Sequence, residues 1–177
     1  MANREALREL QSRLASRLQT ARAQGVGLSW LAVEAAGNRY LLPLHQSGEI
    51  FPWESAHPVP YTQAWFLGVA NLRGGLFSVV ELAGFIAMSK GQGTSQAATR
   101  TDNYLVAFNT ALEVNCALLV EKLVGLRSVD SFARSSPPDS GALPFFGNTY
   151  ADEAGAIWQE IDLQQLASQP HFLSISA

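Results

Sequence analysis

The chain has 177 residues, of which 47% are hydrophobic and 15% charged, and its formal net charge is −3. This composition is that of a folded globular protein, because disordered chains lack the apolar surface that offsets chain entropy. The acidic balance argues against nucleic acid as the main partner, since phosphate binding needs clustered lysine and arginine residues.

Residues 4–23 are predicted to form an amphipathic helix, so residues 1–25 are taken as a segment separate from residues 26–177. Leucines spaced by three and four residues would share one face of this helix: Leu7, Leu10, Leu14 and Leu18. Flanking arginines give residues 1–24 a net charge of +3. The leucine face could pack on the protein itself, on a partner helix or on a membrane surface. The segment matches neither a secretory signal nor a membrane span, so we expect a cytoplasmic protein without direct membrane insertion.

After residue 27 the helical periodicity ends, and short apolar runs alternate with glycine, proline and asparagine. The runs predicted as strands are residues 30–35, 39–44, 49–51, 65–72, 76–82, 104–108, 114–120, 123–127, 149–151 and 156–160. Strands at this spacing indicate an all-β sandwich or barrel rather than a parallel sheet with crossover helices. They divide near residue 90 into two groups of similar size.

Four segments depart from the strand pattern. Residues 82–88 are predicted to form a helical turn, and residues 163–168 a helix whose first turn is capped by Asp162. Residues 89–101 and 135–141 are polar and rich in glycine, serine or proline, so we expect mobile loops there.

The sequence contains no set of residues that would mark an enzyme or a metal site. It lacks the nucleophile elbow, the phosphate loop, the dinucleotide fingerprint and the zinc-binding helix motif. The three histidines are far apart and are expected to be structural or solvated: His45, His57 and His171. The acidic pairs Asp152-Glu153 and Glu160 with Asp162 are expected to have no catalytic role, the first lying in a turn. Cys116, the single cysteine, is expected to be a buried, unreactive thiol. We therefore expect no catalytic residue, metal or cofactor.

Residues 59–82 are the most informative stretch. Gly68 stands where a strand would normally carry a side chain, which usually marks a bulge or a close backbone approach. Residues 71–75 predict a tight reversal with Arg73 at its tip. Arg73 would either pair with an acid of this chain, Glu49 or Glu81, or present its guanidinium to a carboxylate of a partner protein. A partly shielded pair of this kind contributes about 1.5–3 kcal/mol.

This stretch resembles the signature of the CheW-like family, in which V-P is followed by an aromatic residue, G-V-x-N-L-R-G, a short apolar strand and an acid. The matching residues are Val59-Pro60, residues 65–74 and residues 78–82. The resemblance extends over about residues 28–170. Two positions depart from it, because Glu81 stands where aspartate is common and Ser78 where proline often occurs. The leucine-striped N-terminal segment, Trp65-Phe66 and residues 169–175 look closer to the adaptor of the type IV pilus twitching system than to the flagellar one.

The resemblance implies two five-stranded SH3-like barrels, intertwined and side by side over residues 26–177, with an apolar groove between them. It implies a non-enzymatic adaptor recruited to membrane-associated receptor arrays. One face would bind the regulatory domain of a CheA-type histidine kinase, and the groove would take the cytoplasmic tip of a chemoreceptor. The residues carried over as partner contacts are Glu49, Gly68, Asn71, Arg73 and Gly74.

Other functions remain open at this stage. The chain could be a flagellar-type chemotaxis adaptor or a fragment of a larger coupling protein. The groove could instead be a small-molecule or catalytic pocket, which would require titratable groups with shifted pKa values inside it. An SH3-like nucleic-acid binder is disfavoured by the acidic body unless the N-terminal segment is the whole binding element.

Overall fold

A computed structural model describes residues 27–93 and 102–177 of the chain, so the predicted N-terminal helix and residues 94–101 of the first predicted loop lie outside the described residues. The strands are β1 (Ser29–Ala35), β2 (Asn38–Pro43), β3 (Ser47–Pro52), β4 (Phe66–Leu72), β5 (Gly75–Glu81), β6 (Tyr104–Phe108), β7 (Cys116–Val120), β8 (Lys122–Ser128), β9 (Phe132–Ser136), β10 (Phe146–Asp152) and β11 (Ile157–Ile161). The helices are α2 (Leu82–Ser89), α3 (Leu163–Ala167) and α4 (Pro170–Leu173), with short 3-10 turns η1 (Thr110–Leu112) and η2 (Val129–Ser131).

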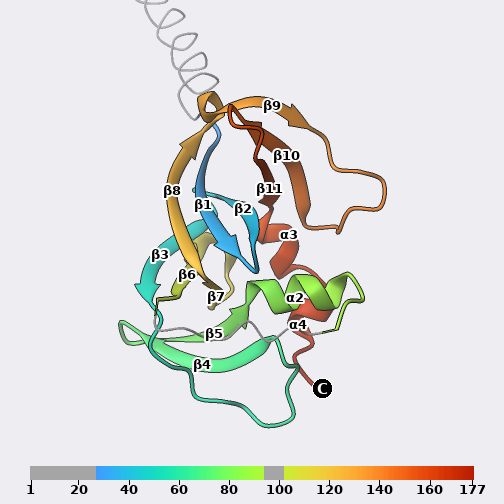
Figure 1. Cartoon of the computed structure of the whole chain (residues 1–177). Coiled ribbons are helices and arrows are strands. Elements are labelled where there is room, and N and C mark those ends of the chain that lie inside the picture. Colours follow the sequence, from blue (N-terminus) through green and yellow to red (C-terminus); the bar gives the residue numbers. More distant parts are fainter. Residues whose placement is uncertain (1–26, 94–101) are drawn as a thin grey trace, which may run out of the picture.

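The strands form two sheets, each of which combines strands from both halves of the chain (Figure 1). The six-stranded sheet has the order β8-β1-β2-β11-β10-β9, and the five-stranded sheet has the order β3-β6-β7-β5-β4. Most neighbouring strands are antiparallel, but β2 pairs in parallel with β11 and β5 in parallel with β7. The two groups of strands seen in the sequence are therefore interleaved, because β1 and β2 join the later strands rather than β3, β4 and β5.

Apolar side chains pack on both faces of the central strands, which explains why these strands appear in the sequence as continuous apolar runs. Along β1, Trp30 and Ala32 belong to a small cluster formed within the six-stranded sheet, whereas Leu31 and Val33 belong to the main core. The five-stranded sheet has a small cluster of its own: Ala70, Val79, Leu105, Ala107, Ala117 and Leu119. The main core contains residues of both sheets and of all three helices, and so it holds the two sheets together.

The three helices gather on one side of the molecule, where the two sheets meet (Figure 1). The ring of Phe172 in α4 lies 5.2 Å from that of Phe85 in α2 and 6.1 Å from that of Phe108 in β6. Asp162 accepts a 3.0 Å hydrogen bond from the Gln165 N–H at the start of α3, so the predicted cap is confirmed. The predicted helical turn at residues 82–88 is a longer helix, α2, because its apolar residues pack in the main core.

Within the described residues, every strand except β9 overlaps an apolar run that was predicted as a strand. β9 contains one large apolar residue and pairs only with β10 at the edge of its sheet, so its sequence carries little strand signal. The loop predicted at residues 135–141 is wrong at its start, because Ser135 and Ser136 belong to β9. β9 also gives its sheet six strands where five were expected.

Cys116 is 1% exposed, as predicted, and burial raises the pKa of its thiol. No helix among residues 27–93 and 102–177 has the length and apolar character needed to cross a membrane.

Candidate functional site

The β4–β5 hairpin ends in a two-residue turn formed by Arg73 and Gly74. Their φ angles are 49° and 83°, and two successive positive φ values are typical of a type I′ turn, whose twist matches that of the flanking strands. The Asn71 side chain stabilises the turn, since its Oδ1 accepts a 2.8 Å hydrogen bond from the Gly74 N–H. The tight reversal predicted for residues 71–75 is therefore present, with the arginine at its tip.

Arginine is an unusual choice for the first position of such a turn. Asparagine, aspartate or glycine usually occupies it, because a left-handed backbone costs other residues about 1–2 kcal/mol. The Arg73 side chain is 76% exposed, so burial in the core does not offset this cost. Strained backbone that persists in a native structure is concentrated at functional sites.

Arg73 forms an ion pair with Glu49 of β3, with 2.7 Å between Nη1 and Oε1. Of the two acids considered as partners within the chain, Glu49 is the correct one, whereas Glu81 lies at the opposite end of β5. Because β3 and β4 are the outer strands of their sheet, this contact links its two edges. An exposed pair contributes only about 0.2–1 kcal/mol, and a guanidinium has five N–H donors. Pairing with Glu49 therefore leaves Arg73 able to bind a second carboxylate.

Gly68 marks both a bulge and a close backbone approach. The pairing register between β4 and β5 shifts between Phe66 and Gly68, and the φ angle at Gly68 is 127°. The carbonyl oxygen of His57 occupies the space where a side chain at position 68 would begin. The backbone that approaches Gly68 is thus part of the same chain, and a role for Gly68 in partner binding stays a prediction.

The chain after β3 approaches the outer edge of β4 at two points and leaves a hollow between them. His57 and Val69 exchange two backbone hydrogen bonds of 2.7 and 2.9 Å at one end, and Glu49 pairs with Arg73 at the other. The hollow, here called the seam, has a volume of about 280 Å³. It is lined by Phe51, Pro52, Glu54, Ser55, His57, Ala70, Asn71, Leu72, Arg73 and Leu105.

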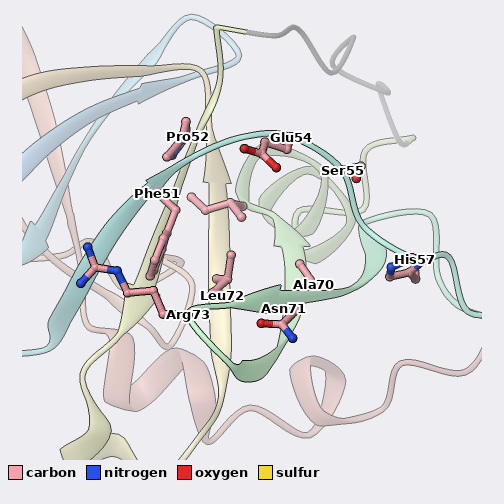
Figure 2. Close-up of a pocket in the computed structure, with 10 residues that line it drawn as sticks. Phe51, Pro52, Glu54, Ser55, His57, Ala70, Asn71, Leu72 and Arg73 are labelled. Atoms are coloured by element: carbon pink, nitrogen blue, oxygen red, sulfur yellow. The ribbon is translucent and has the colours of Figure 1, made fainter.

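Figure 2 shows how the seam is built. The segment that carries Pro52, Glu54 and Ser55 runs along one side, and the β4 strand with Ala70 and Asn71 runs along the other. Leu105 of β6 is 2% exposed and belongs to the small cluster of the five-stranded sheet, so the floor of the seam reaches that cluster. The floor is consequently apolar, while the rim carries charged and polar side chains.

Four of the five candidate contact residues gather at this end of the five-stranded sheet. Glu49, Asn71, Arg73 and Gly74 are exposed and lie on β3 or on the β4–β5 hairpin, whereas Gly68 is buried farther along β4. The sequence analysis missed the seam itself, because the residues that the β3–β4 connection contributes carry no motif. The only early signal was Gly68, whose missing side chain indicated a close backbone contact.

The acidic pairs considered for catalysis have structural contacts. Asp152 accepts hydrogen bonds from Trp158 Nε1–H at 3.1 Å and from the Ala156 N–H at 2.9 Å, and these bonds lower the pKa of its carboxyl group. Glu160 accepts from Trp30 Nε1–H at 2.8 Å, and Asp162 caps α3. Among the residues that the structure describes, no cluster of three or more His, Cys, Asp or Glu side chains is arranged to hold a metal ion.

Comparisons with known proteins give one consistent result. Residues 29–171 match the family model of the CheW-like domain. The chain is 26% identical over 167 residues to Protein PilI of Pseudomonas aeruginosa, which covers 93% of this chain and 89% of the relative. Among solved structures, the scaffolding protein TtCheW from Thermoanaerobacter tengcongensis superposes with a TM-score of 0.60 at 17% identity. That match covers 77% of this chain and 89% of TtCheW, and it indicates a common fold.

Proposed function

Because the chain belongs to the CheW-like domain family, we propose that it is a non-enzymatic adaptor that couples a methyl-accepting chemoreceptor to a CheA-type histidine kinase. Its similarity to PilI supports a place in the control of type IV pilus twitching motility. The protein would act in the cytoplasm, at membrane-associated receptor arrays. It would transfer no phosphate itself, need no cofactor and bind no nucleic acid.

The observation that carries this proposal is the exposed Arg73 on a strained turn. A residue that raises the energy of the hairpin and buries little surface contributes nothing obvious to the fold beyond a weak ion pair with Glu49. Its value is explained if the guanidinium contacts another protein, where directional charge pairs give specificity. Asn71 and Gly74 fix the turn, and Glu49 holds the guanidinium in place, so these four residues form one docking surface. Gly68 supports this surface from within β4.

The receptor tip is assigned to the junction of the two sheets. A hollow of about 310 Å³ lies there, between the β1–β2 hairpin and α2. Its lining residues are Ala36, Asn38, Tyr40, Ala83, Ile86, Ala87, Lys90, Gln92 and Gly93. An amphipathic helix placed in an apolar groove is a common mode of peptide recognition.

We also propose that residues 26–177 form one domain of two intertwined SH3-like barrels, with residues 1–25 as a separate helix. For the five-stranded sheet, closure is supported by the His57–Val69 hydrogen bonds and the Arg73–Glu49 pair, which link its outer strands. For the six-stranded sheet, the outer strands β8 and β9 are joined by η2 and pack on the same small cluster.

Binding to the kinase tests the proposal directly. The purified protein should bind the regulatory domain of a CheA-type kinase from the same organism with a micromolar or lower Kd, about −8 kcal/mol or stronger. The twitching assignment predicts tighter binding to the kinase encoded beside type IV pilus genes than to a flagellar-type kinase. Absence of binding to every such domain at micromolar concentration would refute the coupling function.

A further inference from the structure

The seam has the size and lining of a socket for one side chain. Its volume of about 280 Å³ lies below the range of roughly 300–1,000 Å³ that small-molecule pockets occupy. Its floor is formed by Phe51, Ala70, Leu72 and Leu105, all of which pack in the cluster of the five-stranded sheet. Binding energy at protein interfaces is concentrated where an aromatic or other bulky side chain fills such a pocket and is surrounded by a polar rim.

The rim gives the occupant an orientation. Arg73 stands at one end with most of its donors unused by Glu49, which favours a carboxylate there. Glu54 lies on the segment across the seam from β4 and favours a hydrogen-bond donor on that side (Figure 2). The rim therefore complements a protein segment in which an acid precedes or follows the inserted apolar side chain.

The location of the seam selects the partner. It opens between β3 and β4, within one sheet, whereas the receptor tip is assigned to the junction of the two sheets. On the basis of the proposed coupling function, we propose that the seam binds the kinase regulatory domain by taking one bulky apolar side chain whose neighbouring carboxylate pairs with Arg73. This contact would add an apolar anchor to the charge pair on the hairpin.

Thiol protection tests this inference, because Cys116 is the single cysteine of the sequence and is buried. A Ser55→Cys variant places one accessible thiol at the rim of the seam, and Ser140→Cys places one in an exposed loop that does not line it. A saturating amount of the kinase regulatory domain should slow modification of the Ser55→Cys thiol by about tenfold or more, as expected for a site occupied most of the time. Modification of the Ser140→Cys thiol should change by less than about twofold on the same scale.

A blocking variant gives the second measurement. Ser55→Trp should fill the seam and weaken kinase binding by about tenfold or more, which corresponds to about 1.4 kcal/mol. Ser140→Trp should leave the Kd unchanged, and both variants should keep the wild-type thermal midpoint because both serines are exposed.

The outcomes separate this inference from the coupling function. If the wild-type chain binds the kinase domain, but Ser55→Cys is unprotected and Ser55→Trp binds normally, the seam is not the socket while coupling stands. Protection by the receptor tip in place of the kinase domain would also overturn the inference. If the wild-type chain binds no kinase domain, both proposals fail.

Discussion

Gly84 leaves room for Glu81: a Cβ at position 84 would lie 2.8 Å from Oε2 of Glu81 and 3.3 Å from the Cβ of Trp65. Glu81 is 5% exposed and immediately precedes α2, the helix that contains Gly84. Glutamate stands here where the family signature commonly has the shorter aspartate. The missing side chain of Gly84 therefore accommodates the longer acid.

This relationship predicts opposite effects of one substitution in two backgrounds. Alanine in place of a helical glycine contributes about 1 kcal/mol, whereas overpacking a buried site costs about 1–3 kcal/mol. Gly84→Ala should therefore lower the free energy of unfolding in the wild type and raise it in a Glu81→Asp background. Chemical denaturation of the four proteins measures the coupling. A coupling smaller than about 0.5 kcal/mol would show that the two positions are independent.

Gln46 predicts a second effect on stability, because its side chain joins the β2–β3 connection to the start of α3. Its Oε1 accepts a 2.7 Å hydrogen bond from the Leu163 N–H, and its Nε2 donates to Asp162 Oδ1 at 3.1 Å. Gln46→Ala removes the acceptor of a buried N–H and should lower the free energy of unfolding by about 1–3 kcal/mol. Gln164→Ala, an exposed change in α3, should stay within about 0.5 kcal/mol of the wild type. Equal effects of both changes would contradict the bridging role.

Asp152 predicts a dependence of stability on pH. Hydrogen bonds from Trp158 and Ala156 hold the pKa of its carboxyl group below the usual value. A lowered folded-state pKa adds stability at pH values above the unfolded value of about 3.9, and that stability is lost as the pH falls through the folded-state pKa. The difference in unfolding free energy between wild type and Asp152→Asn should therefore be largest near neutral pH and shrink below about pH 4. Asp139→Asn, in an exposed loop, should show no such trend.

The strands could be predicted from the sequence where their apolar character does not depend on distant contacts. β6 has the predicted limits, and β1 and β2 lie within one residue of theirs, because both faces of these strands are covered. β9 could not be found in this way, since its residues are mostly exposed and its pairing with β10 depends on residues later in the chain. The interleaving of the two groups of strands follows from the parallel pairs β2–β11 and β5–β7, which join segments that are far apart in sequence.

The same distinction applies to the candidate site. The turn at Arg73 and Gly74 was predictable because its geometry is set by neighbouring residues. The seam was not, because it is defined by the His57–Val69 and Glu49–Arg73 contacts, which depend on how the strands are assembled. Local sequence therefore identified the tip of the hairpin, and only the fold placed an apolar hollow beside it.

Arg73 predicts a separation of stability from binding. Arg73→Asn should keep or slightly raise the thermal midpoint, because asparagine suits the left-handed position and the lost ion pair is worth at most about 1 kcal/mol. Arg73→Ala keeps the strained backbone and should be slightly less stable than Arg73→Asn, by about 1 kcal/mol or less. Both variants should bind the kinase regulatory domain at least about tenfold more weakly than the wild type.

Lys122→Asn is the matched control, because Lys122 is also exposed and also in an ion pair, with Glu34 on the other sheet. It removes the same charge from the protein, so any general electrostatic attraction to the kinase would fall equally in both variants. If Lys122→Asn weakened binding as much as Arg73→Asn, net charge rather than the hairpin would explain the affinity. If instead Arg73→Asn lowered the thermal midpoint by more than about 5 °C at unchanged affinity, the arginine would belong to the scaffold, since that shift corresponds to more than 1 kcal/mol in a chain of this size.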